Sequence, residues 1–307
     1  MRGFLTYRIA SAIPTILGVT VAVFMFVRLL PGDPARLMAG LDATEDSILL
    51  VRHGLGLDKP LWTQYGIYIQ GLLRGDLGIS NRDFTPVSAH VARAFIPTAE
   101  LTVAAIAVAM LVGLSAGIVA ASAHNTPLDV ALTSGAILGI SLPSFVLAFI
   151  LIWVFAVTLR MFPTGGPEGT FAVVLPAVTL GVAAAATIAR ITRSEMLEVL
   201  SQDYVRAARA KGHAPRAVIL RHALPNTLIP VLTVIGLQVG FLISGAIIVE
   251  TVFSWHGLGR LLVDAIASRD YPVIQGVVLL FALEFIAVNI LTDVFYAWAD
   301  PRIRYQG

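Results

Sequence analysis

Six long apolar stretches, separated by polar connections, dominate the pattern of hydrophobic and polar positions along the chain. A helix that spans a membrane needs roughly 20 predominantly apolar residues, because its backbone polar groups must find partners within the helix itself. The pattern therefore predicts an all-α polytopic membrane protein in which residues 1–307 form a single transmembrane domain. The six predicted spans cover residues 9–30, 101–123, 131–158, 173–188, 228–249 and 273–298.

Positive charges indicate how the predicted spans are oriented. Cytoplasmic connections of membrane proteins carry an excess of Lys and Arg. With the N-terminus inside, the short outer loops contain only Arg160, Arg260 and Arg269, against eleven basic residues on the inner side. We therefore predict that both termini are cytoplasmic. The inner residues are Arg2, Arg8, Arg190, Arg193, Arg206, Arg209, Lys211, Arg216, Arg221, Arg302 and Arg304.

The two longest connections then fall on opposite sides of the membrane. Residues 31–97 form an external loop between the first and second spans, and residues 194–227 form an inner loop between the fourth and fifth. Connections of such length without secondary structure are uncommon. Because the external loop contains Trp62, Tyr65 and Tyr68 among several glycines, we expect a small folded elaboration there.

Composition narrows the class of protein further. The chain is 57% hydrophobic and 13% charged, whereas soluble domains carry about 25% charged residues, which argues against a water-soluble fold. The net charge is only +2 and the basic residues occur in short stretches, so nucleic acid is not expected as a partner. Cysteine is absent, and the six histidines show no metal-ligand spacing, so we expect no metal site. The phosphate-binding sequence G-x-x-x-x-G-K-[ST] is also absent, which excludes ATP binding by that loop.

Small residues recur four positions apart inside the predicted spans. This spacing lets helix backbones approach each other closely. It indicates general close packing or, alternatively, a specific dimerisation motif. The pairs are Gly113 and Gly117, Gly135 and Gly139, and Gly236 and Gly240.

The inner loop has the sequence features of two short helices. Its first part, from Glu195 to Ala210, has one apolar face and is expected to be helical. Gly212 can adopt the left-handed conformation that ends a helix, and Pro215 suits the first turn of the next one. We therefore predict two helices that meet at a glycine elbow on the cytoplasmic face.

The inner loop resembles the cytoplasmic signature of ABC importer permeases, which reads E-A-A, three residues, G, nine residues, I-x-L-P. Arg206 and His222 replace the first Glu and the Ile, as in the branch that contains the dipeptide, oligopeptide and nickel permeases. Five positions match at the same spacing, namely Ala207, Ala208, Gly212, Leu224 and Pro225.

The resemblance covers nearly the whole chain. It implies a permease subunit, not itself catalytic, that imports dipeptides or short oligopeptides across the bacterial cytoplasmic (inner) membrane. Nickel and glutathione importers share the same scaffold, and a proton-coupled secondary transporter or a structural scaffold protein are competing classes. The further matching motifs are P-G-D-P at 31–34, G-D-L-G at 75–78, E-T-V-F-S-W at 250–255, G-L-G-R-L-L-V-D-A-I at 257–266 and D-P-R-I-R-Y at 300–305.

The resemblance also implies partners. ATP and Mg would bind to two ATPase domains, either fused in one chain or separate, and this chain itself would bind no cofactor. A second, similar permease subunit would help to enclose the pathway. An extracytoplasmic substrate-binding protein would deliver the cargo to the outer side, and membrane lipid would surround the helices.

In the family, the first short helix docks in a groove on the ATPase. Small alanine side chains allow close approach, and the basic residues can pair with acidic groups at the rim. The alternative is a loop whose positive charges only set the topology. The residues expected to couple the two proteins are Asp203, Arg206, Ala207, Ala208, Lys211, Gly212, Leu224 and Pro225.

Polar residues inside the spans are the candidates for the translocation pathway. Glu284 lies near the middle of the last span, where an ionised carboxylate costs about 3 kcal/mol by insertion scales. It either lines the pathway or makes a structural contact. The other pathway candidates are Ser141, Ser144, Gln238 and Ser244. The outer loop after the fifth span contains Trp255, His256 and Arg260. These residues either dock the binding protein or pack the neighbouring helices.

Overall fold

The computed structural model describes residues 2–29, 34–39, 43–54, 56–169 and 171–299. Over these residues the protein is helical, and the only strand-like feature in them is a single bridge between Ile79 and Pro86. The α-helices are α1 Arg2–Leu29, α2 Pro34–Ala39, α3 Glu45–Gly54, α4 Leu61–Leu73, α5 Val87–Ser122, α6 Pro127–Ser141, α7 Ser144–Leu151, α8 Val174–Leu200, α9 Asp203–Ala210, α10 Pro215–Ala217, α11 Leu224–Val252, α12 Leu258–Ser268 and α13 Tyr271–Ala299. The described residues also include two π-helical segments, η1 Ile152–Thr158 and η2 Val218–Ala223.

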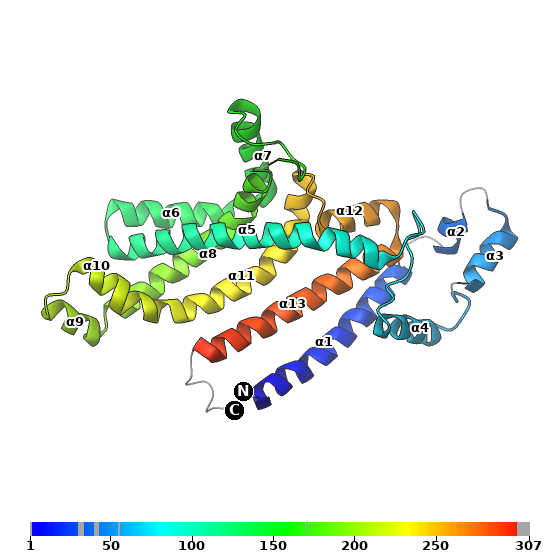
Figure 1. Ribbon diagram of the computed structural model, residues 1–307, viewed down its shortest axis with the longest axis horizontal. Helices are drawn as coiled ribbons and strands as arrows, with labels where there is room; N and C mark the ends of the chain where they lie inside the picture. Colours follow the sequence, from blue (N-terminus) through cyan, green and yellow to red (C-terminus); the bar gives the residue numbers. More distant parts are fainter. Residues whose placement is uncertain (1, 30–33, 40–42, 55, 170, 300–307) are drawn as a thin grey trace.

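The long helices lie side by side and form an elongated bundle (Figure 1). α5 and α8 make the most extensive contact, and α11 packs against both α8 and α13. The start of α1, the end of α13 and the short helices α9 and α10 lie toward one end of the bundle, whereas α2, α3, α4 and α12 lie toward the other. The predicted inner and external loops are thus at opposite ends.

Four helical segments in the described part of the chain are long and apolar enough to cross a membrane. They are α5, α8, the continuous run from Pro215 to Val252, and α13 up to Thr292. The bent pair of α6 and α7–η1 makes a fifth if it is one span, and α1 contains a shorter apolar section, Ala10–Phe26. The count of six spans therefore stays a prediction. Residues 1 and 300–307, which include the D-P-R-I-R-Y motif, lie outside the described residues.

The span predicted over residues 131–158 is not one straight helix. Its two halves, Pro127–Ser141 and Ser144–Thr158, are bent by 106° relative to each other, so the second half projects from the side of the long helices (Figure 1), with α7 in contact with α8 and α11. Leu142 at the break has φ −76° and ψ 122°, an extended conformation. The ring of a proline disfavours the helical conformation in the residue before it, so Pro143 ends α6.

The external loop predicted over residues 31–97 is shorter than expected, because α5 begins at Val87 and contains Pro97. Pro97 has no N–H to donate to the carbonyl of Arg93, but the helix continues through it. Two other contacts tie this part of α5 to its surroundings: the Thr98 hydroxyl donates to Ala94 O over 3.3 Å, and the indole N–H of Trp255 donates to Pro97 O over 2.9 Å.

The rest of the external loop is folded, as the sequence predicts. α4 packs against α1, where the ring of Phe24 lies 5.2 Å from that of Tyr65 and 5.9 Å from that of Tyr68. The Arg28 guanidinium donates through Nε and Nη2 to the Gln64 side-chain oxygen, over 3.0 and 2.8 Å. These contacts attach α4 to the C-terminal half of α1.

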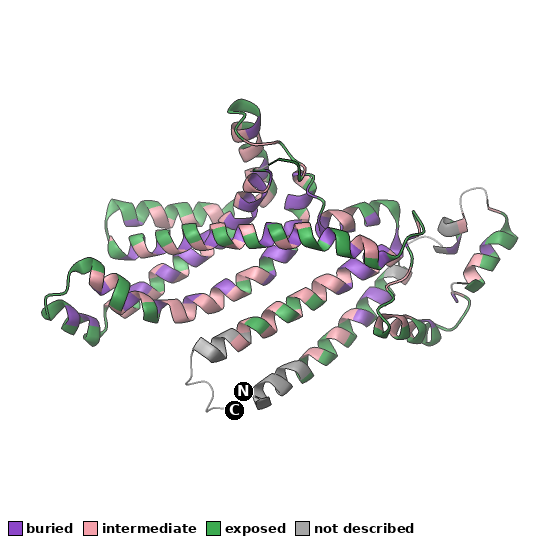
Figure 2. Ribbon diagram, in the orientation of Figure 1, coloured by how far each residue is buried: buried purple, intermediate pink, exposed green. Residues whose placement is uncertain are grey.

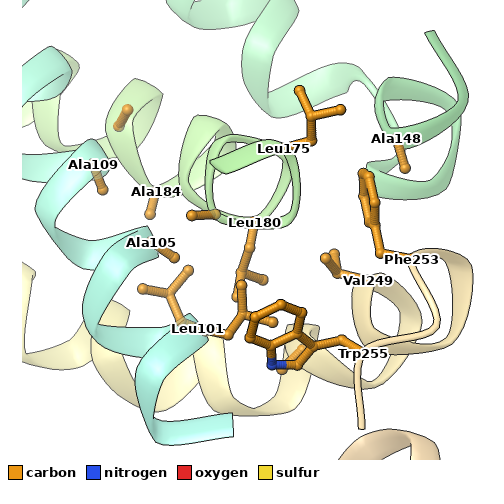
Figure 3. Close-up of a cluster of buried hydrophobic side chains, with 14 of the residues drawn as sticks. Leu101, Ala105, Ala109, Ala148, Leu175, Leu180, Ala184, Val249, Phe253 and Trp255 are labelled. Atoms are coloured by element: carbon orange, nitrogen blue, oxygen red, sulfur yellow. The ribbon is translucent and has the colours of Figure 1, made fainter. Parts of the chain in front are cut away.

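The core lies where α5, α8 and α11 meet (Figure 3). Small residues dominate it, with Ala105, Ala109 and Ala184 between the helices, and Phe253 and Trp255 close one end. Elsewhere the long helices carry many exposed residues along their outer faces (Figure 2), and many of these are large and apolar. Exposed apolar side chains of this kind are typical of helices that face lipid or another membrane subunit.

Glycines bring α5 and α8 into backbone contact. A Cβ added at Gly113 would lie 2.6 Å from the carbonyl oxygen of Ala185, and one at Gly117 would lie 2.6 Å from that of Ala189. By contrast, a Cβ at Gly135 would meet nothing within 4 Å. The recurring glycines thus serve helix packing inside this chain at the first pair and, against Thr292 and Phe285 of α13, at Gly236 and Gly240, but not at Gly135.

Candidate functional site

The inner loop forms an elbow, but its first helix is divided. α8 continues to Leu200, and α9 starts only at Asp203, because Gln202 takes the extended conformation φ −70°, ψ 150°. The prediction of one helix from Glu195 to Ala210 is therefore wrong. Gly212 does adopt the left-handed conformation, with φ +82°, and Pro215 stands in the first turn of α10 as predicted.

The second half of the elbow is part of a longer helix. α10, the π-helical segment η2 and α11 form one continuous run from Pro215 to Val252. Pro225 has no N–H to offer to the carbonyl of Arg221, and the π-helical turn lies directly before it. The elbow is thus continuous with the long helix α11.

Apolar contacts hold α9 and the base of α11 on the end of α8. Met196, Val205, Val218 and Ala223 are at most 1% exposed. Two polar contacts add to them: the Asn226 amide donates to the Tyr204 hydroxyl over 2.8 Å, and the Thr227 hydroxyl contacts the Met196 sulfur at 3.6 Å. The elbow is therefore a packed unit.

The outward face of α9 is basic and open. The Asp203 and Arg206 side chains are exposed and 3.4 Å apart, and Ala207, Lys211 and Gly212 are also exposed. Ala208 is only 6% exposed because it faces the elbow's own core. Contrary to the prediction, its side chain is therefore not available to a partner. Of the predicted coupling residues, Leu224 is half-buried and Pro225 is exposed at the start of α11.

A cavity of about 270 Å³ brings together two of the five pathway candidates, Ser144 and Gln238. No hydrogen-bond partner for either side chain is found among the described residues, so both can bond to a ligand. The cavity wall contains no charged side chain. Its other residues are Gly139, Leu142, Leu147, Thr179, Leu180, Ala183, Ala184, Phe241, Leu242 and Gly245.

The other three pathway candidates lie elsewhere. Ser244 is exposed, and the exposed Ser141 donates its hydroxyl to Ile137 O of its own helix over 2.9 Å.

Glu284 is half-buried on α13, and its Oε2 has no hydrogen-bond partner in the described part of the chain. Gly240 of α11 faces Phe285 of α13, and Gln238 points about 200° away from Gly240 around the helix. Gln238 and Glu284 are therefore on opposite sides of α11, and the role of Glu284 stays a prediction.

At the end of the bundle that carries α12, a buried carboxylate anchors the turn after α11. Glu250 is fully buried and accepts from the Thr98 hydroxyl over 2.6 Å and from Arg260 N over 3.1 Å. Trp255 is 2% exposed, which favours packing over docking for this residue. His256 is exposed and Arg260 is half-buried, so the docking prediction now depends on these two.

Sequence reasoning missed an ion pair toward the end of the bundle that carries α9. Asp129 at the start of α6 is 3% exposed and accepts from Arg193 of α8, over 2.6 Å to Nε and 2.8 Å to Nη2. The backbone N–H of Asn125 also donates to Asp129, over 3.0 Å. The sequence contained one signal for this pair. Asp129 is an isolated acidic residue in the short connection between two apolar stretches, and Arg193 follows the end of another.

Two family models match the chain. The first describes a binding-protein-dependent transport system inner membrane component and matches residues 113–305. The second describes the N-terminal part of a membrane component of such systems and matches residues 1–94. Together they cover nearly the whole sequence.

Curated relatives match over their full length. The glutathione transport system permease protein GsiC of Escherichia coli O6:H1 is 49% identical over 306 residues, which is 100% of both chains. The proteins of the same name from Escherichia coli K12 and Salmonella choleraesuis are 48% and 49% identical, also over 100% of both chains.

Solved structures show the same fold. An inward-facing MetNI methionine ABC transporter has a chain that matches with a TM-score of 0.60 and 19% identity, over 68% of this chain and 96% of its own. An amino acid ABC transporter matches with a TM-score of 0.54 and 17% identity, over 68% and 94%. The chain therefore belongs to the family of inner membrane components of binding-protein-dependent transport systems, and it is a multi-pass permease subunit of an ABC importer.

Proposed function

We propose that this permease subunit imports short peptides, with the tripeptide glutathione as its foremost cargo. The observation that carries the proposal is the similarity to glutathione permeases, which extends over the full length of both chains at 48–49% identity. The sequence comparison therefore covers every helix of the chain. Within the predicted family, this favours the glutathione alternative over nickel and narrows the general peptide prediction.

The chemistry of the cavity beside α11 supports a peptide cargo. Gln238 and Ser144 offer neutral donors and acceptors in a largely apolar wall, which suits amide groups that must be hydrogen-bonded when they leave water. Nickel prefers imidazole and other strong ligands, and the wall contains no His, Asp or Glu. A peptide therefore fits this wall better than a metal ion.

We also propose how the subunit is driven. ATP and Mg bind to two partner ATPase domains, since the chain has no phosphate-binding loop of its own. The exposed basic face of α9 docks on them, and the movement enters α11 through the continuous helix that starts at Pro215. A second permease subunit and a substrate-binding protein on the outer side complete the assembly.

Uptake by the reconstituted complex tests the cargo. Proteoliposomes that contain the permease pair, the ATPase subunits and the binding protein should accumulate labelled glutathione only when ATP is supplied inside. Unlabelled glutathione and short peptides should compete, and nickel should not. Saturable nickel uptake, or uptake that a proton gradient drives without ATP, would contradict the proposal.

Replacing Gln238 by leucine should weaken cargo recognition in the pathway. The change keeps the volume but removes the amide that faces the cavity, so the KM of glutathione uptake should rise about tenfold, corresponding to one or two lost hydrogen bonds. Gln70→Leu makes the same change at an exposed position of α4 and serves as the matched control. Equal kinetics for the wild type and Gln238→Leu would remove Gln238 from the pathway.

A further inference from the structure

We propose that a second cavity, at the inner end of α5, α6 and α8, binds the phosphate headgroup of an anionic lipid. The cavity has a volume of about 200 Å³ and is walled by three helices. It is separate from the cavity that contains Gln238, with which it shares no residue. Its lining residues are Ala116, Ala120, Leu132, Thr133, Ala136, Ala189, Arg190, Arg193 and Ser194.

Arg190 supplies the charge for such a ligand. Its side chain is exposed, and no ion pair or hydrogen bond is found for it among the described residues. The other arginine in the wall, Arg193, is already neutralised by its two bonds to Asp129. No acidic side chain lines the cavity, so its net charge is positive. A guanidinium binds phosphate oxygens through two parallel hydrogen bonds, which makes phosphate the ligand that fits best.

The wall of the cavity is held in place by buried polar contacts. Asp129 joins the α5–α6 turn to α8 through Arg193 and also accepts from Asn125 N. The Thr133 hydroxyl lies 3.4 Å from Asp129 Oδ1, and no partner is found for Ser194 in the part of the chain that the structure describes. Because these contacts fix the three helices relative to one another, the site exists before any ligand binds.

The position of the cavity indicates a lipid as the source of the phosphate. Arg190 lies at the end of the apolar part of α8, on the side that the distribution of basic residues assigns to the cytoplasm. Next to the cavity, α6 exposes Val130, Ile137 and Leu138, each more than half exposed, as a helix in contact with acyl chains would. Basic pockets between transmembrane helices on the cytoplasmic side are suited to anionic headgroups.

Lipid retention by the purified complex tests the site directly. The permease complex, extracted from membranes in mild detergent, should retain phosphatidylglycerol or cardiolipin in native mass spectra. Arg190→Gln should lower the apparent affinity for added anionic lipid at least tenfold, the loss expected for one charge-assisted contact. Arg190→Lys should restore part of it. Arg216→Gln removes another exposed arginine, which lies outside the cavity, and should leave retention unchanged.

A second variant distinguishes the effect of the positive charge from that of the space in the cavity. Ala136→Leu fills the cavity without changing any charge and should also reduce retention, whereas a purely electrostatic attraction to the membrane surface would leave it intact. If neither Arg190→Gln nor Ala136→Leu changes lipid retention, the proposal fails. If Arg190→Gln instead releases the second permease subunit with lipid retention unchanged, the cavity belongs to the subunit interface and the proposal is equally overturned.

Thermal unfolding in nanodiscs distinguishes a lipid from a soluble anion. Anionic lipid should raise the Tm of the wild-type complex and not that of Arg190→Gln, because a ligand stabilises only the state that binds it. Inorganic phosphate added to nanodiscs of phosphatidylcholine alone should not reproduce the shift, and a full shift with phosphate would assign the site to a soluble anion. None of these measurements depends on transport, so an incorrect cargo assignment leaves the test valid.

Discussion

Gly212→Val should abolish ATP-driven uptake while the protein remains inserted in the membrane. Gly212 has φ +82° at the turn between α9 and α10, and a left-handed conformation is unfavourable by about 1–2 kcal/mol for residues with a Cβ. A β-branched valine will therefore shift the elbow and move the basic face of α9 away from the ATPase. Uptake should fall by more than tenfold, while ATP hydrolysis continues or loses its dependence on cargo.

The control for this change is Gly212→Asn. Asparagine tolerates the left-handed conformation better than other residues with a side chain, and no atom lies within 4 Å of an added Cβ at this position, so its effect should be small. Uptake and ATP hydrolysis are measured together in proteoliposomes. Normal uptake by the valine variant would contradict a coupling role for the elbow.

Gly117→Ala should prevent the correct packing of α5 on α8. The added Cβ would lie 2.6 Å from Ala189 O and from the Thr192 Cβ, closer than a Cβ comes to any atom that is not bonded to it, so the two helices must shift. Overpacking in a dense core costs about 1–3 kcal/mol, and here the contact is with backbone, which cannot rotate away. We expect a marked loss of folded complex, measured by size-exclusion chromatography and thermal unfolding in detergent.

Gly135→Ala makes the same change where an added Cβ meets nothing within 4 Å. Alanine stabilises a helix by about 1 kcal/mol relative to glycine, so this variant should be as stable as the wild type or more so. Equal stability of the two variants would show that backbone contact between α5 and α8 is not needed for folding.

The features that follow from local composition could be predicted from the sequence. Apolar stretches of sufficient length located the long helices. The Gly212 and Pro215 pattern located the elbow, because glycine permits the left-handed conformation and proline fixes φ whatever the distant residues are. The matches to the importer signature gave the family. These are the predictions that the structure and the comparisons confirm.

The features that depend on distant contacts could not be predicted. The break at Gln202 was missed because apolar residues on both sides of it, Met196 and Val205, face the same core, so the pattern reads as one helix. Trp255 looks like a surface residue in its loop, and only its contact with Pro97, far away in the sequence, places it in the core. Pairing of Asp129 with Arg193 likewise needs the packing of α6 on α8.

The helix that runs without interruption from Pro215 to Val252 contains 38 residues. At 1.5 Å per residue it is about 57 Å long, well beyond the roughly 30 Å of a hydrocarbon core. Its outer end is fixed by Glu250, which joins it to α5 and α12. If the helix turns about this fixed end, a tilt of about 10° displaces its other end, together with the elbow and the end of α8 packed on it, by about 10 Å. A large displacement of the elbow thus requires only a slight change of angle at the end of the helix that Glu250 fixes.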